Sequence, residues 1–129
     1  MNISAKTGLS ISQLDWQWPD SLDAIAAAPG NHKLLFENEH VRVLDTRIES
    51  GDRTPVHTHC WPASMYILSW SDFIRYSDTG EVMLDSRTVE ALRVPPAVLW
   101  SDPLPPHSLE NIGETPLHVI SVEVKGAAS

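Results

Sequence analysis

The sequence of 129 residues contains one cysteine, Cys60. A single cysteine cannot form a disulfide within the chain, which excludes a disulfide-stabilised fold and favours a reducing compartment. Long apolar runs are missing as well. No segment approaches the ~20 apolar residues of a membrane span, and residues 1–7 lack the apolar region of a secretory signal. We therefore expect a cytoplasmic protein with no membrane partner.

Positive charge is scarce. Lys and Arg number 9 against 17 Asp and Glu, which gives a formal net charge of −8 at pH 7. The basic residues form no run that would make a stripe for binding a phosphate backbone. This charge balance argues against nucleic acid as a partner.

Helical patterns are short and confined to the N-terminal part of the chain. An alanine-rich stretch over residues 22–28 follows Asp20 and Ser21, which favour a helix start, and it is closed by Pro29 and Gly30. We assign residues 1–31 to an N-terminal flank with a short helix, 32–125 to the main domain and 126–129 to a tail.

The main domain consists of short runs of β-branched and aromatic residues, separated by Gly, Pro, Asn and Asp. These runs predict nine strands, over residues 33–37, 40–49, 56–60, 64–69, 73–77, 82–85, 98–101, 108–112 and 117–124. Because no long helix lies between them, an all-β antiparallel sandwich or barrel is expected. Prolines stand where the predicted strands begin or end, at positions 55, 62, 95, 96, 103, 105, 106 and 116.

Three histidines form the clearest candidate site. His57 and His59 are two residues apart, and alternate residues of a strand point to the same side, so this pair delivers two imidazoles in one direction. His107, from a distant part of the chain, would complete a three-histidine metal site. Imidazole suits zinc, iron, copper and nickel.

The spacing of these histidines resembles the two sequence motifs of the cupins. The residues that carry the resemblance are a glycine and the histidine pair of the first motif, then a histidine, an asparagine and a glycine of the second: Gly51, His57, His59, His107, Asn111 and Gly113. Residues 106–117 are similar to the second motif and the following strand of many small single-domain cupins, and residues 38–43 resemble the strand before the first motif. The resemblance covers about residues 32–125.

The resemblance implies a double-stranded β-helix, the cupin jelly-roll barrel, behind the short N-terminal helical flank. It also implies a homodimer and a divalent metal ion held by His57, His59 and His107. The sequence does not distinguish Fe(II), Zn, Ni and Mn. Cupins that use three histidines include thiol dioxygenases and oxygenases that cleave diketones or gentisate, which bind their substrate to Fe(II).

The chain departs from the cupin pattern in its acidic ligand. Cupins place a glutamate ligand shortly after the second histidine, where this chain has Ala63 and Ser64. The glycine that ends the first motif is also missing, and proline replaces the glycine of the second motif within residues 103–107. A divalent ion held by three neutral imidazoles keeps its full charge. We therefore predict a small anionic molecule as the ligand, such as a thiolate, an enolate, or a 2-oxo or hydroxy acid.

Further residues are candidates for contact with that molecule. Tyr66 is the candidate catalytic residue, because a phenol near a metal can donate a hydrogen bond to bound substrate. Arg42, Arg47 and Arg75 lie in predicted strands, and an inward arginine would grip a carboxylate with two hydrogen bonds. A structural role is expected for His118.

The remaining histidines and the cysteine are not expected in the site. His32 and His40 resemble ordinary loop or strand-edge residues. Cys60 directly follows His59, so strand alternation should turn it away from the histidine pair.

Three functions are compatible with this pattern. The preferred one is a metal-dependent cupin that acts on a small anionic molecule, for example as an Fe(II)-dependent dioxygenase. The second is a non-catalytic cupin that binds or senses a small ligand, which the missing glutamate favours. The third is a degenerate structural cupin without metal, in which Trp16 and Trp18 of the flank would mediate assembly. An epimerase or isomerase with a histidine base needs no metal, but little in the chain selects it.

Overall fold

The computed structural model describes residues 16–126. Residues 1–15 of the predicted flank and 127–129 of the predicted tail lie outside the described residues. Among the helices of residues 16–126, none combines the length and the apolar character needed to span a membrane.

The described chain contains nine strands, as the sequence predicts: β1 (His32–Glu37), β2 (Val41–Ile48), β3 (His57–His59), β4 (Ala63–Ser69), β5 (Phe73–Ser77), β6 (Val82–Asp85), β7 (Val98–Ser101), β8 (Leu104–Asn111) and β9 (Leu117–Val124). Their bounds agree with the predicted ones to within one residue, except that β8 begins at Leu104.

The early start of β8 corrects the expectation that prolines only flank strands, because Pro105 and Pro106 lie inside this strand. Over Leu104–Asn111, β8 pairs with β5 only from His107 onward, so the two prolines need no hydrogen-bonding partner on that side. The pairing with β3 is irregular at the same place, where its register shifts between His57 and His59. Proline is tolerated at such irregular, half-paired positions.

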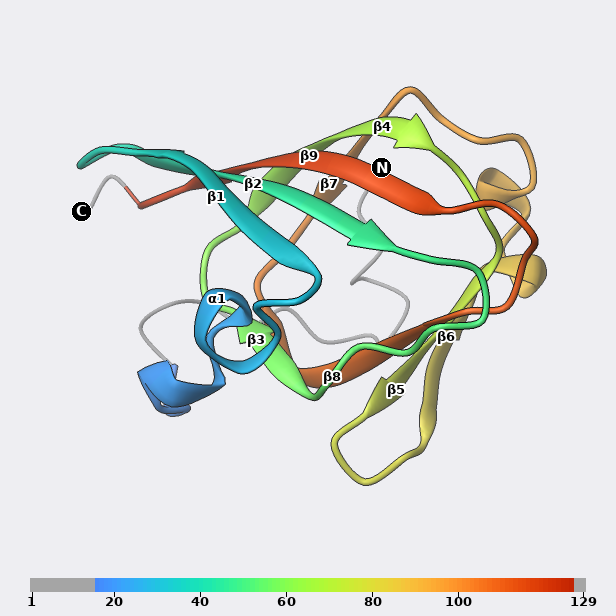
Figure 1. Ribbon diagram of the computed structural model, residues 1–129, viewed down its shortest axis with the longest axis horizontal. Coiled ribbons are helices and arrows are strands. Elements are labelled where there is room, and N and C mark those ends of the chain that lie inside the picture. The colour runs from blue at the N-terminus through green and yellow to red at the C-terminus, as the bar shows by residue number, and fades with distance from the viewer. Residues whose placement is uncertain (1–15, 127–129) are drawn as a thin grey trace.

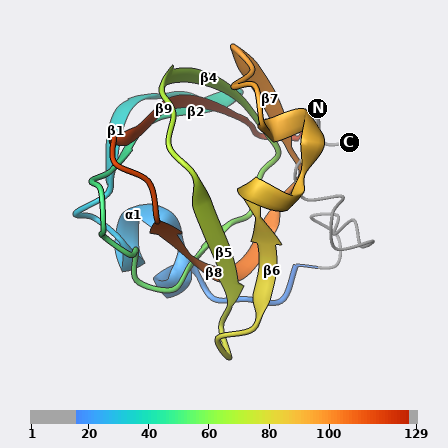
Figure 2. The same ribbon diagram turned by 90° about the vertical axis from the view of Figure 1, so that its right-hand side faces the viewer.

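The strands form two antiparallel sheets that face each other (Figure 1). The larger sheet has the order β1-β2-β9-β4-β7, and the smaller has the order β3-β8-β5-β6. Figure 2 shows the sheets from one end, curving around a common interior. The apolar core between them comes from both sheets and from the turn before β7: Ile48, Phe73, Leu84, Leu92, Leu99 and Leu117.

Short helical turns complete the fold. The flank forms a 3-10 turn η3 (Asp20–Leu22) and the predicted short helix, α1 (Ala24–Ala27), and the link between β6 and β7 contains η4 (Ser86–Thr88) and η5 (Glu90–Leu92). The Asp23 carboxylate caps α1 by accepting a hydrogen bond from the Ile25 amide at 3.1 Å. Asp23 also forms a parallel bridge with Thr58, so the flank packs directly against β3. Figure 1 shows α1 beside β3.

Asn111 holds three loops together at the end of β8. It is fully buried, and its amide donates hydrogen bonds to the carbonyls of Ile48 and Thr115 at 2.9 and 2.8 Å. Its side-chain oxygen accepts from the Ser71 hydroxyl and the Gly113 amide. Asn111 is absent from the lining of the central cavity, so its role is to brace these loops.

We expect Asn111→Ala to lower the free energy of unfolding by about 3 kcal/mol or more, because several buried groups lose their hydrogen-bond partner. Asn38→Ala is the matched control, since the Asn38 side chain accepts from two backbone amides at an exposed turn and its loss should cost roughly 1 kcal/mol. Urea unfolding followed by circular dichroism measures both. Equal losses in the two variants would contradict the bracing role.

Candidate metal centre

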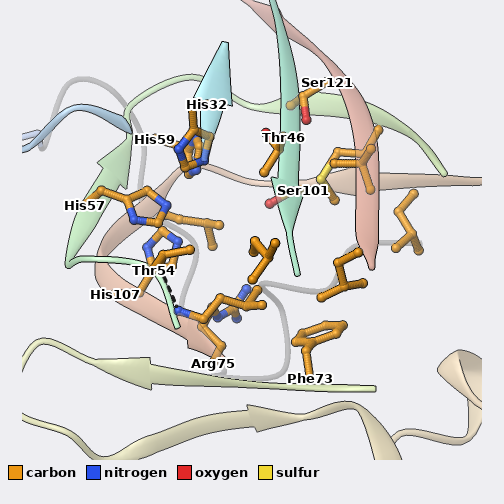
Figure 3. Close-up of a pocket in the computed structure, with 18 of the residues that line it drawn as sticks. His32, Thr46, Thr54, His57, His59, Phe73, Arg75, Ser101, His107 and Ser121 are labelled. Atoms are coloured by element: carbon orange, nitrogen blue, oxygen red, sulfur yellow. Dashed lines mark hydrogen bonds between the residues drawn. The ribbon is translucent and has the colours of Figure 1, made fainter. Parts of the chain in front are cut away.

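Four histidine rings lie together at one end of the space between the sheets (Figure 3). His57 and His59 come from β3, His107 from β8 and His32 from the start of β1. His57 and His107 are direct partners in the β3–β8 pairing, and their ring centroids are 4.4 Å apart. The centroid of His57 is also 4.7 Å from that of His32 and 5.0 Å from that of His59. The three predicted ligands are therefore brought together, and a fourth histidine joins them.

Each of the four rings is fixed through Nδ1. The acceptors are the carbonyls of Ala28 for His32 (3.0 Å), Pro55 for His57 (2.8 Å) and Pro105 for His107 (2.8 Å), and the carboxylate of Glu123 for His59 (3.0 Å). Carbonyl and carboxylate oxygens only accept, so each Nδ1 carries the proton and each Nε2 keeps a lone pair. Hydrogen bonds of this kind orient metal-binding histidines in other proteins.

The free ring nitrogens make a suitable donor set for a metal ion. One ligand atom from each of His32, His57 and His59 lies within 4.8 Å of the others. His107 is not in this group, although its ring centroid is 4.4 Å from that of His57. Nitrogen ligands of this type bind divalent transition metals, and three or four of them satisfy a zinc or non-haem iron site that leaves positions for water or substrate. The cluster could therefore hold a divalent metal.

Burial keeps three of these imidazoles neutral, those of His32, His57 and His107. It lowers the pKa of His57 from 6.5 to about 2 and that of His32 to about 4, and neighbouring histidines add to both effects. The pKa of His107 is also held well below its usual value, first by burial and then by His57, His59 and Arg75. Neutral imidazole is the form that binds a metal, so these three rings need not lose a proton to bind one at neutral pH.

A carboxylate reaches the site from a strand that the cupin motif does not include. Ala63, where cupins place glutamate, lies opposite Glu123 of β9 in the β4–β9 pairing. Glu123 is 1% exposed and lines the same cavity. Its two oxygens accept from Arg42 Nε at 2.6 Å and from His59 Nδ1, so both oxygens are engaged and the carboxylate supports a histidine.

A buried chain of charges extends from Glu123 to the flank. Arg42 donates to both oxygens of Asp23 at 2.8 Å while its Nε binds Glu123. Burial alone would raise the pKa of Glu123 and of Asp23, but the hydrogen bonds and charges of their partners outweigh it and lower both. The flank therefore belongs to the site, because it supplies Asp23 to this series of ion pairs and the Ala28 carbonyl to His32.

The histidines open into a cavity of about 120 Å³ whose other walls are largely apolar. Its apolar lining comes from both sheets and includes Met65, Ile67, Phe73, Leu99 and Leu109. Figure 3 shows the histidines on one side, Phe73 on the far side and Arg75 between them. A small molecule with an apolar part fits such a space.

The structure places the other predicted site residues in different environments. Arg75 lines the cavity, whereas Arg42 is paired as described and Arg47 binds Glu49 at the surface. Tyr66 is 55% exposed and is absent from the cavity lining. The proposal of Tyr66 as a catalytic residue near the metal is therefore wrong, because at its position β4 turns the phenol outward. His118 has a structural role, with its Nε2 2.7 Å from Asp45.

Sequence reasoning missed two residues of the site, His32 and Glu123. His32 was interpreted as a loop or edge residue, but it is the first residue of β1 and 5% exposed. No neighbouring histidine marks it in the sequence. The buried face of β9 ends in Glu123, and a charged residue in a predicted strand is the signal that could have found it. Both faces of this strand carry apolar residues, so alternation alone does not identify the inner one.

The metal-free protein should lose stability as the pH falls below 6.5. The pKa values of His32, His57 and His107 are lowered in the folded protein, so the unfolded chain binds these protons first. The contribution of these neutral imidazoles to the free energy of unfolding is therefore fully present above pH 6.5. Below that pH it falls by about 1.4 kcal/mol per pH unit for each histidine, down to about pH 4 for His32. Urea unfolding of EDTA-treated protein between about pH 7 and pH 5 measures this slope.

His32→Gln should reduce the slope, because one of the three contributing imidazoles is removed. The matched control is His40→Gln, since the His40 side chain is 75% exposed, and it should keep the slope of the wild type. A wild-type protein whose stability is unchanged between these pH values would refute the buried, neutral state of the cluster.

Comparisons with known proteins identify the fold. No protein-family model matches the sequence, and a search of curated proteins finds no match. Solved structures do match. A cupin domain from Bordetella pertussis has a TM-score of 0.57 at 17% identity, over 74% of this chain and 92% of that one.

Two further structures agree. An RmlC-like cupin family protein with a double-stranded β-helix fold from Methanocaldococcus jannaschii has a TM-score of 0.51 at 15% identity, over 72% of this chain and 77% of that one. A conserved protein with a double-stranded β-helix domain from Klebsiella pneumoniae has a TM-score of 0.51 at 16% identity, over 92% of this chain and 86% of that one. The protein therefore has the cupin fold, a double-stranded β-helix, which the resemblance of its sequence implied.

Proposed function

We propose that this protein is a metal-binding cupin that holds a divalent transition metal through His57, His59 and His107, with His32 as a fourth ligand, and acts on a small anionic molecule in its barrel. The observation that carries the proposal is the common arrangement of the four rings. Each has its Nδ1 fixed by an oxygen acceptor, which leaves its Nε2 available beside the cavity.

The charge of the site supports an anionic ligand. The four imidazoles contribute no charge when neutral, and Arg42 offsets one of the two carboxylates, Glu123 and Asp23, with which it pairs. A bound divalent ion would therefore keep most of its positive charge, and Arg75 adds another positive group to the same cavity. A thiolate, an enolate or a carboxylate would be attracted to this environment.

An Fe(II)-dependent dioxygenase is the catalytic form of this proposal. The metal would supply Lewis acidity and, as iron, redox chemistry with dioxygen. The protein's part is to orient the substrate and to exclude water, for which the apolar walls around Met65, Phe73 and Leu99 are suited. The homodimer and the absence of a nucleic-acid partner stay predictions.

A non-catalytic cupin that binds or senses a small ligand is the second candidate. Among the described residues that line the cavity, Glu123 is the sole carboxylate, and both of its oxygens are engaged. This leaves no free carboxylate there for proton transfer, which favours binding over acid–base chemistry.

Untagged protein reconstituted with Fe(II), Zn(II), Ni(II) or Mn(II) should retain about one ion per chain for at least one of these metals. His57→Ala and His107→Ala should abolish this retention, and His32→Ala should weaken it. Glu123→Gln should reduce metal affinity by about 10- to 100-fold, because it disturbs the partner that orients His59. Elemental analysis after gel filtration, together with metal titration, measures these changes.

The matched control is His118→Gln, because His118 also pairs with a carboxylate but lies outside the cavity. It should retain metal like the wild type. Full metal retention in both His57→Ala and His107→Ala would show that the ion binds elsewhere.

Oxygen consumption separates the catalytic from the binding role. Fe(II)-loaded protein should consume dioxygen with at least one member of a panel of thiols, diketones and hydroxy acids, and His57→Ala should not. If the loaded wild type binds members of the panel without consuming oxygen, the dioxygenase form is excluded and the binding role remains.

A further inference from the structure

Arg75 carries a buried charge that no described residue balances. Its side chain rises from the middle of β5 into the cavity, and the residue is 3% exposed. Within residues 16–126, no ion pair and no side-chain hydrogen bond involves its guanidinium. Arg42 is also buried, but it has two carboxylate partners.

The unpaired state of Arg75 is costly for the fold. Moving a charged group out of water without a partner is strongly unfavourable, and native proteins rarely accept it. Burial alone lowers the pKa of Arg75 to about 10, so the group is still charged at neutral pH. Proteins commonly trade stability for function, so an unpaired charge at a cavity wall is a candidate binding group.

The missing partner is not supplied by Glu123. This carboxylate lines the same cavity, but Arg42 and His59 occupy its two oxygens. The backbone of Arg75 is paired with Leu109 and Leu84, so strand pairing holds the residue in place while its guanidinium remains available.

We propose that Arg75 binds the carboxylate of a small organic acid inside the barrel, with the rest of the acid against the apolar wall and its second polar group toward the histidines. The guanidinium offers two parallel N–H donors, which match the two oxygens of a carboxylate. The orientation toward the histidines rests on the proposed function, whereas the Arg75–carboxylate contact does not.

The walls restrict the size and character of this acid. A dry protein cavity of about 150 Å³ holds a molecule such as benzene, so the volume of about 120 Å³ here suits an acid of roughly six non-hydrogen atoms. Phe73 lies two residues from Arg75 on the same face of β5, and both side chains line the cavity. An alkyl or thioalkyl carboxylate can bury its chain there, while an inorganic anion leaves the apolar wall unused.

Butyrate is the probe, with butyramide as its uncharged analogue and inorganic phosphate as the anion without an apolar part. The titration uses full-length, EDTA-treated protein and follows the Arg75 Nε–Hε signal by NMR and the affinity by calorimetry. Butyrate should shift this signal and bind at least tenfold more tightly than either analogue. Equal binding of butyrate and butyramide, or tighter binding of phosphate, would overturn the proposal.

Substitutions test the contact directly. Arg75→Gln should weaken butyrate binding at least tenfold, and Arg75→Lys should fall between it and the wild type, because lysine keeps the charge but loses the paired donors. The matched control is Arg87→Gln, since Arg87 is an exposed arginine paired with Asp85, and it should bind butyrate like the wild type.

Thermal unfolding without ligand distinguishes binding from a structural role. Arg75→Gln should melt at the same temperature as the wild type or a few degrees higher, because an unpaired buried charge is removed. A large drop in melting temperature would assign Arg75 to the fold and contradict the proposal. Because the probe is tested without metal, failure to bind butyrate would leave the metal proposal intact, and failure to bind metal would leave the Arg75 contact intact.

Discussion

The pairing of Glu123 with Arg42 and His59 is the interaction on which the site depends. Glu123 is almost completely buried on β9, the central strand of the larger sheet, and its two oxygens connect β9 to β2 and to β3. Arg42 passes the connection on to Asp23, which also caps α1. Removing one partner of a buried ion pair typically costs about 3–5 kcal/mol, because the other charge is left uncompensated. The same carboxylate that stabilises the packing of the flank therefore also fixes the direction of a candidate metal ligand.

The chain differs from the usual cupin pattern in where its carboxylate stands and what it does. Ala63 stands where cupins have a ligand glutamate. The carboxylate in this site is that of Glu123 on the neighbouring strand, and it accepts a hydrogen bond from Nδ1 of His59. The candidate metal ligands are therefore all imidazoles, with no carboxylate among them. A cation bound by neutral imidazoles would retain its positive charge, which would attract an anionic ligand. Arg75 strengthens this effect from the other side of the cavity. Both features favour an anionic ligand, and the unpaired charge of Arg75 has a cost in stability when no anion is bound.

Local patterns predicted most of the fold, because each strand is a short run of β-branched or aromatic residues bounded by turn residues. The histidine pair and His107 were identified because two of them are two residues apart in one strand and the third matches a known spacing. His32 and Glu123 were not identified, since their roles arise from contacts with the histidines of β3, which lie far from both residues in the sequence. Tyr66 failed for a related reason: β4 has apolar residues on both faces, so its inner side is set by packing and not by pattern.

The central claim is that the ring nitrogens of this cluster bind a metal ion together. X-ray absorption spectroscopy of the Fe(II)-loaded or Zn(II)-loaded protein tests it most directly, because imidazole ligands give a characteristic scattering pattern beyond the nearest shell. The account predicts at least three imidazole nitrogens at about 2.0–2.1 Å from the metal, with one fewer in His32→Gln than in the wild type. A spectrum with oxygen ligands only, or one unchanged by His57→Ala, would contradict it.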